Sequence, residues 1–272
     1  MLFVHDNKID MLLFLGLLAE TLYAVAGWRI WRAGHLPAAL LPITLALHAA
    51  ALSLQIFHAG SLRLGLAESV SLFAWQSALT LWLFSLREKL ESLGMFLYPF
   101  VGLCALFGVF TSNTHGDLIP ISDWHVEVHI IISLLSAGIL TIACIQAVAL
   151  AVLERVLRHR GGGIAVVRRL PPLQTMERLL FQMVFAGFFL LSLTLLSGLL
   201  FVHNLAAQHL EQKTVLSFCA WFIFGLLLWG RRRYGWRGHT AVRWVLAGYL
   251  MLVLAYFGSK LFIEQVLGTH WN

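Results

Sequence analysis

Long apolar runs alternate with short polar stretches along most of the 272-residue chain. The polar stretches contain glycine, proline and many of the charged residues, which interrupt helices. Eight of the apolar runs have the length that an α-helix needs to cross a bilayer, roughly 20 residues. We therefore predict an all-α integral membrane protein, an eight-transmembrane-helix bundle that forms a single polytopic domain. The predicted spans are residues 11–28, 36–57, 66–86, 93–110, 124–153, 179–203, 215–229 and 244–266.

The composition agrees with a membrane protein, because 60% of the residues are hydrophobic and only 12% are charged. Soluble domains carry about 25% charged residues. The net charge of +6 would suggest nucleic-acid binding in a soluble protein. Here 15 of the 19 Lys and Arg residues lie in the first, third, fifth and seventh linkers. By the positive-inside rule these linkers face the cytoplasm, so we expect both termini outside and no nucleic-acid partner.

One histidine lies within a predicted span rather than at its end. His48 is twelve residues into span two, which places it about 18 Å deep, near the bilayer middle. Thr44 and Gln55 share its helix face. A polar group at this depth must face the bundle and find a partner. Packing against a neighbouring helix and a functional role both remain open from the sequence.

The segment SDWHVEVHIIIS, residues 122–133, begins span five with two histidines four residues apart. The leading Ser and Asp can cap the helix, and Glu127 is favourable in its first turn. Capping does not explain His125 and His129. The zinc motif HExxH has its Glu next to the first His, whereas Glu127 lies midway and points about 160–200° away from both histidines. We therefore exclude a Glu-assisted hydrolytic metal site.

Haem binding suits these histidines better. A haem site needs one or two axial ligands, an apolar slot and counter-charges for the propionates. His129 lies one turn deeper than His125, where the apolar run begins. Histidines are also common at membrane interfaces, so a structural role stays open. The residues that could supply ligands or counter-charges near this level are His125, His129, His203, His270, Arg63 and Lys213.

Several segments resemble a known family. They are LHAAALSLQIFHAGSLRLGLAESVSLFAW at 47–75, WHVEVHIIISLLSAGIL at 124–140, KTVLSFCAWFIFGLLLWGRRRYGWRG at 213–238, LAYFGSKLF at 254–262 and the tail LGTHWN. They resemble the integral-membrane cytochrome c assembly protein family, haem-handling proteins typified by CcsA and CcmC, and within it the short YpjD and HemX-like branch. The resemblance implies a multi-pass protein of the bacterial cytoplasmic (inner) membrane.

The same resemblance implies a set of haem ligands. His129 and His270 would be the external axial pair on the iron of haem b, with His125 as the alternative to His129. His48 would be one of two intramembrane histidines.

Two positions depart from the family pattern. The loop between spans six and seven reads FVHNLAAQHLEQKT, without the tryptophans that present haem to an apocytochrome in the family. Trp229 stands where the second intramembrane histidine is expected. His203 lies in the altered loop and could replace part of it. We therefore do not expect cytochrome c synthase activity.

The sequence thus predicts a membrane haem-binding accessory protein involved in haem handling or cytochrome c assembly. Its expected partners are the lipid bilayer, haem and proteins of cytochrome assembly or haem synthesis. Two alternatives stay open. One is a transporter of a small polar or ionic substrate that passes the polar face around His48. The other is a non-catalytic regulator or scaffold that docks a partner through the arginine-rich linker at 154–172.

Overall fold

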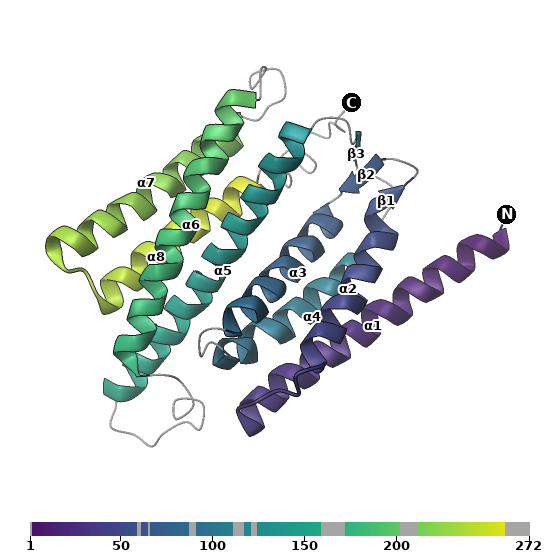
Figure 1. The fold of residues 1–272 in the computed structure, drawn as a ribbon, viewed down its shortest axis with the longest axis horizontal. Helices are drawn as coiled ribbons and strands as arrows, with labels where there is room; N and C mark the ends of the chain where they lie inside the picture. The colour runs from purple at the N-terminus through teal and green to yellow at the C-terminus, as the bar shows by residue number, and fades with distance from the viewer. Residues whose placement is uncertain are drawn as a thin grey trace. The chain divides into compact units, whose positions relative to one another are not determined.

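A computed structural model describes residues 2–58, 61–64, 66–86, 91–110, 117–120, 124–158, 172–201 and 211–258. Over these residues it contains eight α-helices (Figure 1). They are α1 Leu2–Ala33, α2 Leu40–Ile56, α3 Leu66–Ser85, α4 Gly94–Phe110, α5 Trp124–Arg158, α6 Leu173–Phe201, α7 Glu211–Tyr234 and α8 Gly238–Val253. A 3₁₀ turn, Glu91–Leu93, precedes α4, and a π-helical turn, Leu254–Gly258, continues α8.

Each predicted span coincides with one of these helices. Five segments are long and apolar enough to cross a membrane: Met11–Ala33, Val128–Arg158, Leu173–Leu200, Lys213–Tyr234 and Gly238–Tyr256. The helices α2 and α4 are shorter and apolar. The predicted helical membrane class is therefore confirmed, while the number of eight membrane spans, the orientation of the termini and the single domain stay predictions.

A small antiparallel sheet adds to the predicted all-helical fold. Its strands are β1 Phe57–His58, β2 Ser61–Leu64 and β3 Asp117–Pro120, in the order β1-β2-β3. Leu62 pairs with Phe57 on one side and with Ile119 on the other. The sheet ties the connection between α2 and α3 to the segment that follows α4.

The contacts divide the chain into two compact units, residues 1–122 and 123–272. In the first unit α1 packs against α2 and α4, and α3 packs against α4. In the second, α5 packs against α6 and α8, and α7 packs against α8. Small residues permit these close approaches: a Cβ at Gly187 of α6 would lie 2.6 Å from the Leu140 side chain of α5.

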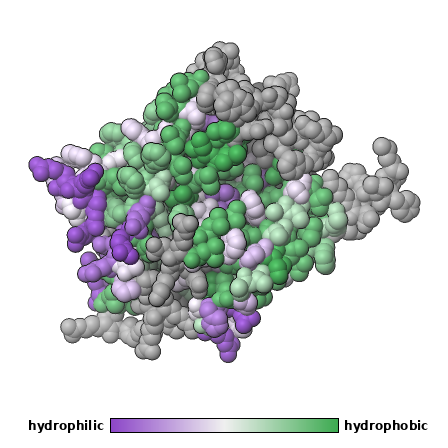
Figure 2. All heavy atoms as spheres, viewed as in Figure 1, coloured by the Kyte–Doolittle hydropathy of each residue, from purple (hydrophilic) through white to green (hydrophobic). Residues whose placement is uncertain are grey.

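The helices expose apolar side chains outward, as expected for surfaces that face lipid. Figure 2 shows apolar residues over much of the visible helix surface. Exposed aromatic residues on these helices include Phe14, Phe100, Phe185, Phe189 and Phe222.

The turn between α7 and α8 is closed by backbone hydrogen bonds. Gly235 N–H donates to Arg231 O at 3.2 Å, the bond of the αL pattern at a helix end, and Trp236 N–H donates to Gly230 O at 3.4 Å. Gly235 has φ 67°, the left-handed conformation that this pattern requires. Trp236 also stacks on Trp244 of α8, with ring centroids 5.3 Å apart.

Candidate functional site

His48 lies in the core of the first unit and is 1% exposed. Its Nε2 is 3.0 Å from Ser71 Oγ of α3, and its Nδ1 is 3.4 Å from the Tyr23 hydroxyl of α1. The Tyr23 ring meets the imidazole edge-on at 5.8 Å and stacks on Tyr98 of α4 at 6.2 Å. The two side chains predicted to share the His48 face, Thr44 and Gln55, are buried as well.

These contacts leave His48 with no open ring nitrogen. To bind a metal, the imidazole would have to give up a hydrogen bond to Ser71 or Tyr23. Both partners would then be buried polar groups without their histidine, which is unfavourable in an apolar interior. Of the two interpretations left open by the sequence, the contacts favour the packing role, in which His48 joins α1, α2 and α3.

His129 has a different environment, one turn into α5 of the second unit. It is half-buried, and its Nδ1 lies 2.8 Å from Ser197 Oγ of α6. A Cβ at Gly198, the next residue on α6, would lie 3.4 Å from His129 Cε1. The imidazole therefore packs against α6 at Gly198, where there is no side chain, and Ser197 forms a hydrogen bond with its Nδ1.

The hydrogen bonds assign the imidazole tautomer. Ser197 Oγ donates its single hydrogen to Thr194 O at 2.9 Å. The serine oxygen therefore accepts from His129, so Nδ1 carries the proton and Nε2 presents a lone pair. Among the residues that the structure describes, Nε2 has no hydrogen-bond partner. A metal-binding histidine has this form, with one nitrogen fixed by a neighbour and the other free to ligate.

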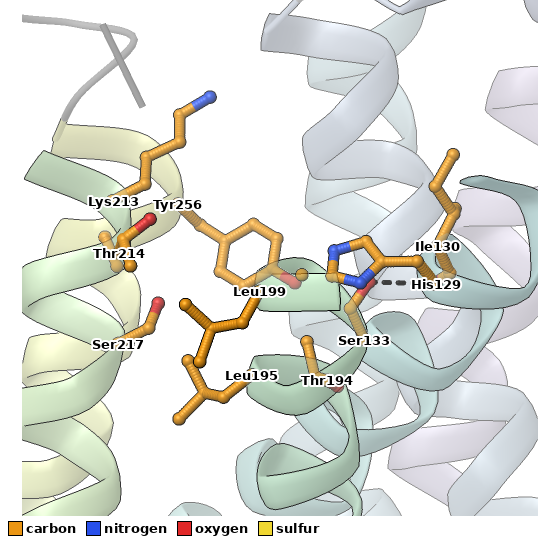
Figure 3. A pocket seen from close by; sticks show the side chains of 12 residues that line it. His129, Ile130, Ser133, Thr194, Leu195, Leu199, Lys213, Thr214, Ser217 and Tyr256 are labelled. Atoms are coloured by element: carbon orange, nitrogen blue, oxygen red, sulfur yellow. Dashed lines mark hydrogen bonds between the residues drawn. The ribbon is translucent and has the colours of Figure 1, made fainter. Parts of the chain in front are cut away.

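A cavity of about 270 Å³ lies beside His129 (Figure 3). The imidazole points into it, toward the Tyr256 ring. Most of the wall is apolar, with a few polar groups, which is typical of small-molecule sites of about 300–1,000 Å³. The cavity volume is just below the lower end of that range, so a ligand as large as haem would extend beyond it. The lining residues are His129, Ile130, Ser133, Thr194, Leu195, Gly198, Leu199, Lys213, Thr214, Ser217, Ala255 and Tyr256.

Tyr256 reaches the cavity from the π-helical turn that continues α8. Ser133, which lines the cavity beside it, donates its hydroxyl hydrogen to Ile130 O at 2.8 Å. π-Helical turns are rare and frequent at functional sites, but nothing in the apolar periodicity of LAYFGSK signals one. Tyr256 was missed for this reason.

Of the other predicted site residues, Lys213 lines the same cavity as His129. His125 lies in the first turn of α5, where only the backbone is described. The backbone of Arg63 lies in β2 of the first unit. His203 and His270 lie outside the described residues.

No group of three or more His, Cys, Asp or Glu side chains within the described ranges could hold a metal ion. The iron of haem takes only axial ligands from a protein. The lone Nε2 on an apolar cavity fits that requirement.

Comparison with known proteins gives a consistent result. Residues 63–267 match the family described as cytochrome C assembly protein. The matched part begins within β2 and includes His129, but it leaves out α1 and α2 and therefore His48. The match covers α3 and α4 of the first unit as well as the described helices of the second.

Individual relatives agree with the family match. The chain is 34% identical over 230 residues to the inner membrane protein YpjD of Escherichia coli K12, which covers 83% of this chain and 85% of the relative. The YpjD protein of E. coli O157:H7 matches to the same extent. An uncharacterized 28.8 kDa protein in the nifR3-like 5′ region of Azospirillum brasilense is 32% identical over 145 residues, or 53% of each chain.

No solved structure shows a significant match. The chain is a homologue of an inner membrane protein and has several apolar helices of membrane length. Three quarters of its length falls within one family match, and its relatives extend over most of its residues. The chain belongs to the cytochrome c assembly protein family.

Proposed function

We propose that the protein is a haem-binding accessory protein of the bacterial cytoplasmic membrane, acting in haem handling or cytochrome c assembly. His129 would hold the haem iron on one side and His270 would be the second ligand. The observation that carries this proposal is the open Nε2 of His129 on an apolar cavity, with Nδ1 held by Ser197. Haem b supplies the iron centre, and this chain supplies ligation and apolar enclosure.

The charge pattern supports placing the cavity at the outer membrane surface. The helix that carries His129 ends with Arg155 and Arg158, and α7 runs from Lys213 at the cavity to Arg231, Arg232 and Arg233. The arginine-rich ends lie away from the cavity along both helices. Under the positive-inside rule those ends are cytoplasmic, so the cavity opens outward and both termini are outside.

The proposal does not include formation of the thioether bond to a cytochrome. The chain lacks the family's tryptophan-rich loop between α6 and α7, and Trp229 replaces an intramembrane histidine. The cavity around His129 accounts for holding or passing on haem. The transport alternative has less support, because the polar face around His48 is closed by hydrogen bonds to Tyr23 and Ser71.

Absorption spectroscopy of the purified full-length protein tests the proposal. Protein purified from cells or incubated with haemin should show a Soret band that shifts on reduction. His129→Ala should lose most of this band, and His270→Ala should change the ligation state of the iron. His48→Ala is the matched control and should keep the wild-type spectrum. A protein that stays colourless and takes up no added haemin contradicts the proposal.

A further inference from the structure

We infer that the α7 wall of the cavity is a carboxylate subsite that fixes the orientation of the bound ligand. Its residues are Lys213, Thr214 and Ser217. This inference rests on the proposed function and deepens it: the ligand class is an amphipathic metalloporphyrin whose carboxylate edge lies at α7 while its metal lies at His129.

The two ends of the cavity have opposite chemistry. His129 enters from α5 with a nitrogen lone pair, which attracts a Lewis acid. Across the cavity, Lys213, Thr214 and Ser217 follow one another on α7 at spacings that place them on neighbouring faces of one helical turn. Figure 3 shows the three on one helix, separated from His129 by the Tyr256 ring. The positive charge of the Lys213 ammonium group attracts an anion, and the hydroxyl groups of Thr214 and Ser217 can donate hydrogen bonds to it.

The wall between these ends is apolar. Ile130, Leu195 and Leu199 line it, and the Tyr256 ring adds a flat aromatic surface. A ligand that satisfies the whole cavity therefore needs three parts in order: a metal centre, an apolar body and an anionic edge. A porphyrin with propionates on one edge has this arrangement.

The position of Lys213 suits the anionic edge. It is the first residue of a membrane-length segment and lines the cavity, and in Figure 3 its side chain extends away from the Tyr256 ring, with the ammonium group outermost. A lysine at a span end commonly extends its ammonium group into the interface. A carboxylate bound there would be partly shielded from water, which strengthens its attraction to the ammonium compared with bulk solvent.

The simpler role for Lys213 is an interfacial anchor that binds no ligand. If Lys213 is only an anchor, neutralising it changes protein stability or has little effect. Any change in ligand affinity is then the same whether or not the ligand has free carboxylates. The carboxylate subsite predicts a dependence on those carboxylates. Comparing haemin with haemin dimethyl ester separates the two, because the ester keeps the iron and the apolar macrocycle but has no free carboxylate.

The experiment is a titration of full-length protein in detergent with each of the two ligands, followed by the Soret band. The wild type should bind haemin about tenfold or more tightly relative to the ester, the effect expected for a hydrogen bond to a charged group. Lys213→Gln should remove most of this preference and leave ester binding unchanged. Lys213→Arg should keep it, and Ser217→Ala should reduce it partly.

Failure of the carboxylate subsite and failure of the proposed haem binding give different results. A preference for haemin over the ester that is unchanged in Lys213→Gln overturns the subsite and leaves haem binding at His129 intact. Equal binding of both ligands by the wild type also overturns the subsite alone. A wild-type protein that binds neither ligand overturns the proposed function and, with it, the subsite.

Discussion

The Nδ1 atom of His129 on α5 lies 2.8 Å from the hydroxyl oxygen of Ser197 on α6. The two residues are 68 positions apart, so packing of two long helices, rather than local sequence, sets the orientation of the imidazole. Because the serine hydrogen is directed to Thr194 O, the same contact determines which ring nitrogen is protonated. Ser197 is therefore a positioning residue for the site, although it does not line the cavity.

Ser197→Ala should weaken haemin binding without removing His129. The substitution deletes the acceptor for Nδ1–H, so the ring can rotate and change tautomer. Loss of such a supporting contact typically costs about 10–100-fold in metal affinity. Haemin titration checks this, and Ser197→Thr should restore most of the affinity because it keeps the hydroxyl.

Ser136→Ala provides the matched control for the serine change. Ser136 Oγ on α5 donates to Gly187 O on α6 at 3.1 Å, so it also joins these two helices but lies away from His129. The Ser136→Ala substitution should lower the melting temperature slightly and leave haemin affinity unchanged. Equal loss of affinity in both variants would mean that helix packing in general, not the His129 contact, governs binding.

Gly198 should tolerate alanine but not leucine. An added Cβ would lie 3.4 Å from His129 Cε1, an ordinary van der Waals contact. A longer side chain would extend into the space of the imidazole and the cavity. We expect near wild-type haemin binding for Gly198→Ala and loss of binding for Gly198→Leu, with both proteins retaining helical circular dichroism. Unimpaired binding by the leucine variant would place the ligand elsewhere.

His48→Ala should destabilise the first unit and leave the haem spectrum unchanged. The change removes contacts to Tyr23 and Ser71 that join three helices. Each interhelical hydrogen bond in a membrane protein contributes about 0.6 kcal/mol on average, and the lost imidazole also leaves a void. Thermal unfolding in detergent measures the loss. A changed Soret band with unchanged stability would instead support the intramembrane-ligand hypothesis.

Gly238→Ala should be destabilising at the start of α8. Gly238 has φ 51°, and an added Cβ would lie 2.5 Å from Glu154 Oε1. Its N–H donates to Glu177 Oε1 at 2.9 Å, which ties α8 to α6. The left-handed conformation alone costs a residue with a Cβ about 1–2 kcal/mol, and the steric overlap adds to it.

Gly235→Ala separates these two contributions. Gly235 has a similar φ of 67° but nothing within 4 Å of an added Cβ. It should lower the melting temperature through backbone strain only, and less than Gly238→Ala. A smaller effect at Gly238 than at Gly235 would show that the Glu154 side chain moves aside without loss of stability.

The helices were predictable because an apolar run of bilayer length has few alternatives to a helix. The residues at which these helices begin and end were harder to predict. The second span was predicted from residue 36, but α2 begins at Leu40, after a turn in which Leu40 N–H bonds to Pro37 O. The last span was predicted from residue 244, but α8 begins at Gly238. Helices extend into polar flanks wherever backbone groups can continue their hydrogen bonds.

The sheet and the tyrosine could not be predicted for a different reason. The pairing of Leu62 with Ile119 joins segments separated by two helices, and strands of two to four residues are too short to show alternation. Likewise, Tyr256 reaches the cavity from a π-helical turn. His129 was predictable as a candidate, but its open nitrogen depended on Ser197, which no local motif indicates.

The π-helical turn at Leu254–Gly258 also affects how relatives should be aligned. A π turn contains one residue more than the α turn it replaces. A homologue with an unbroken α-helix here would be one residue shorter. Counting positions across this turn without a gap would shift everything that follows by one. Assignments of tail histidines between family members therefore need a gap tested at this turn first.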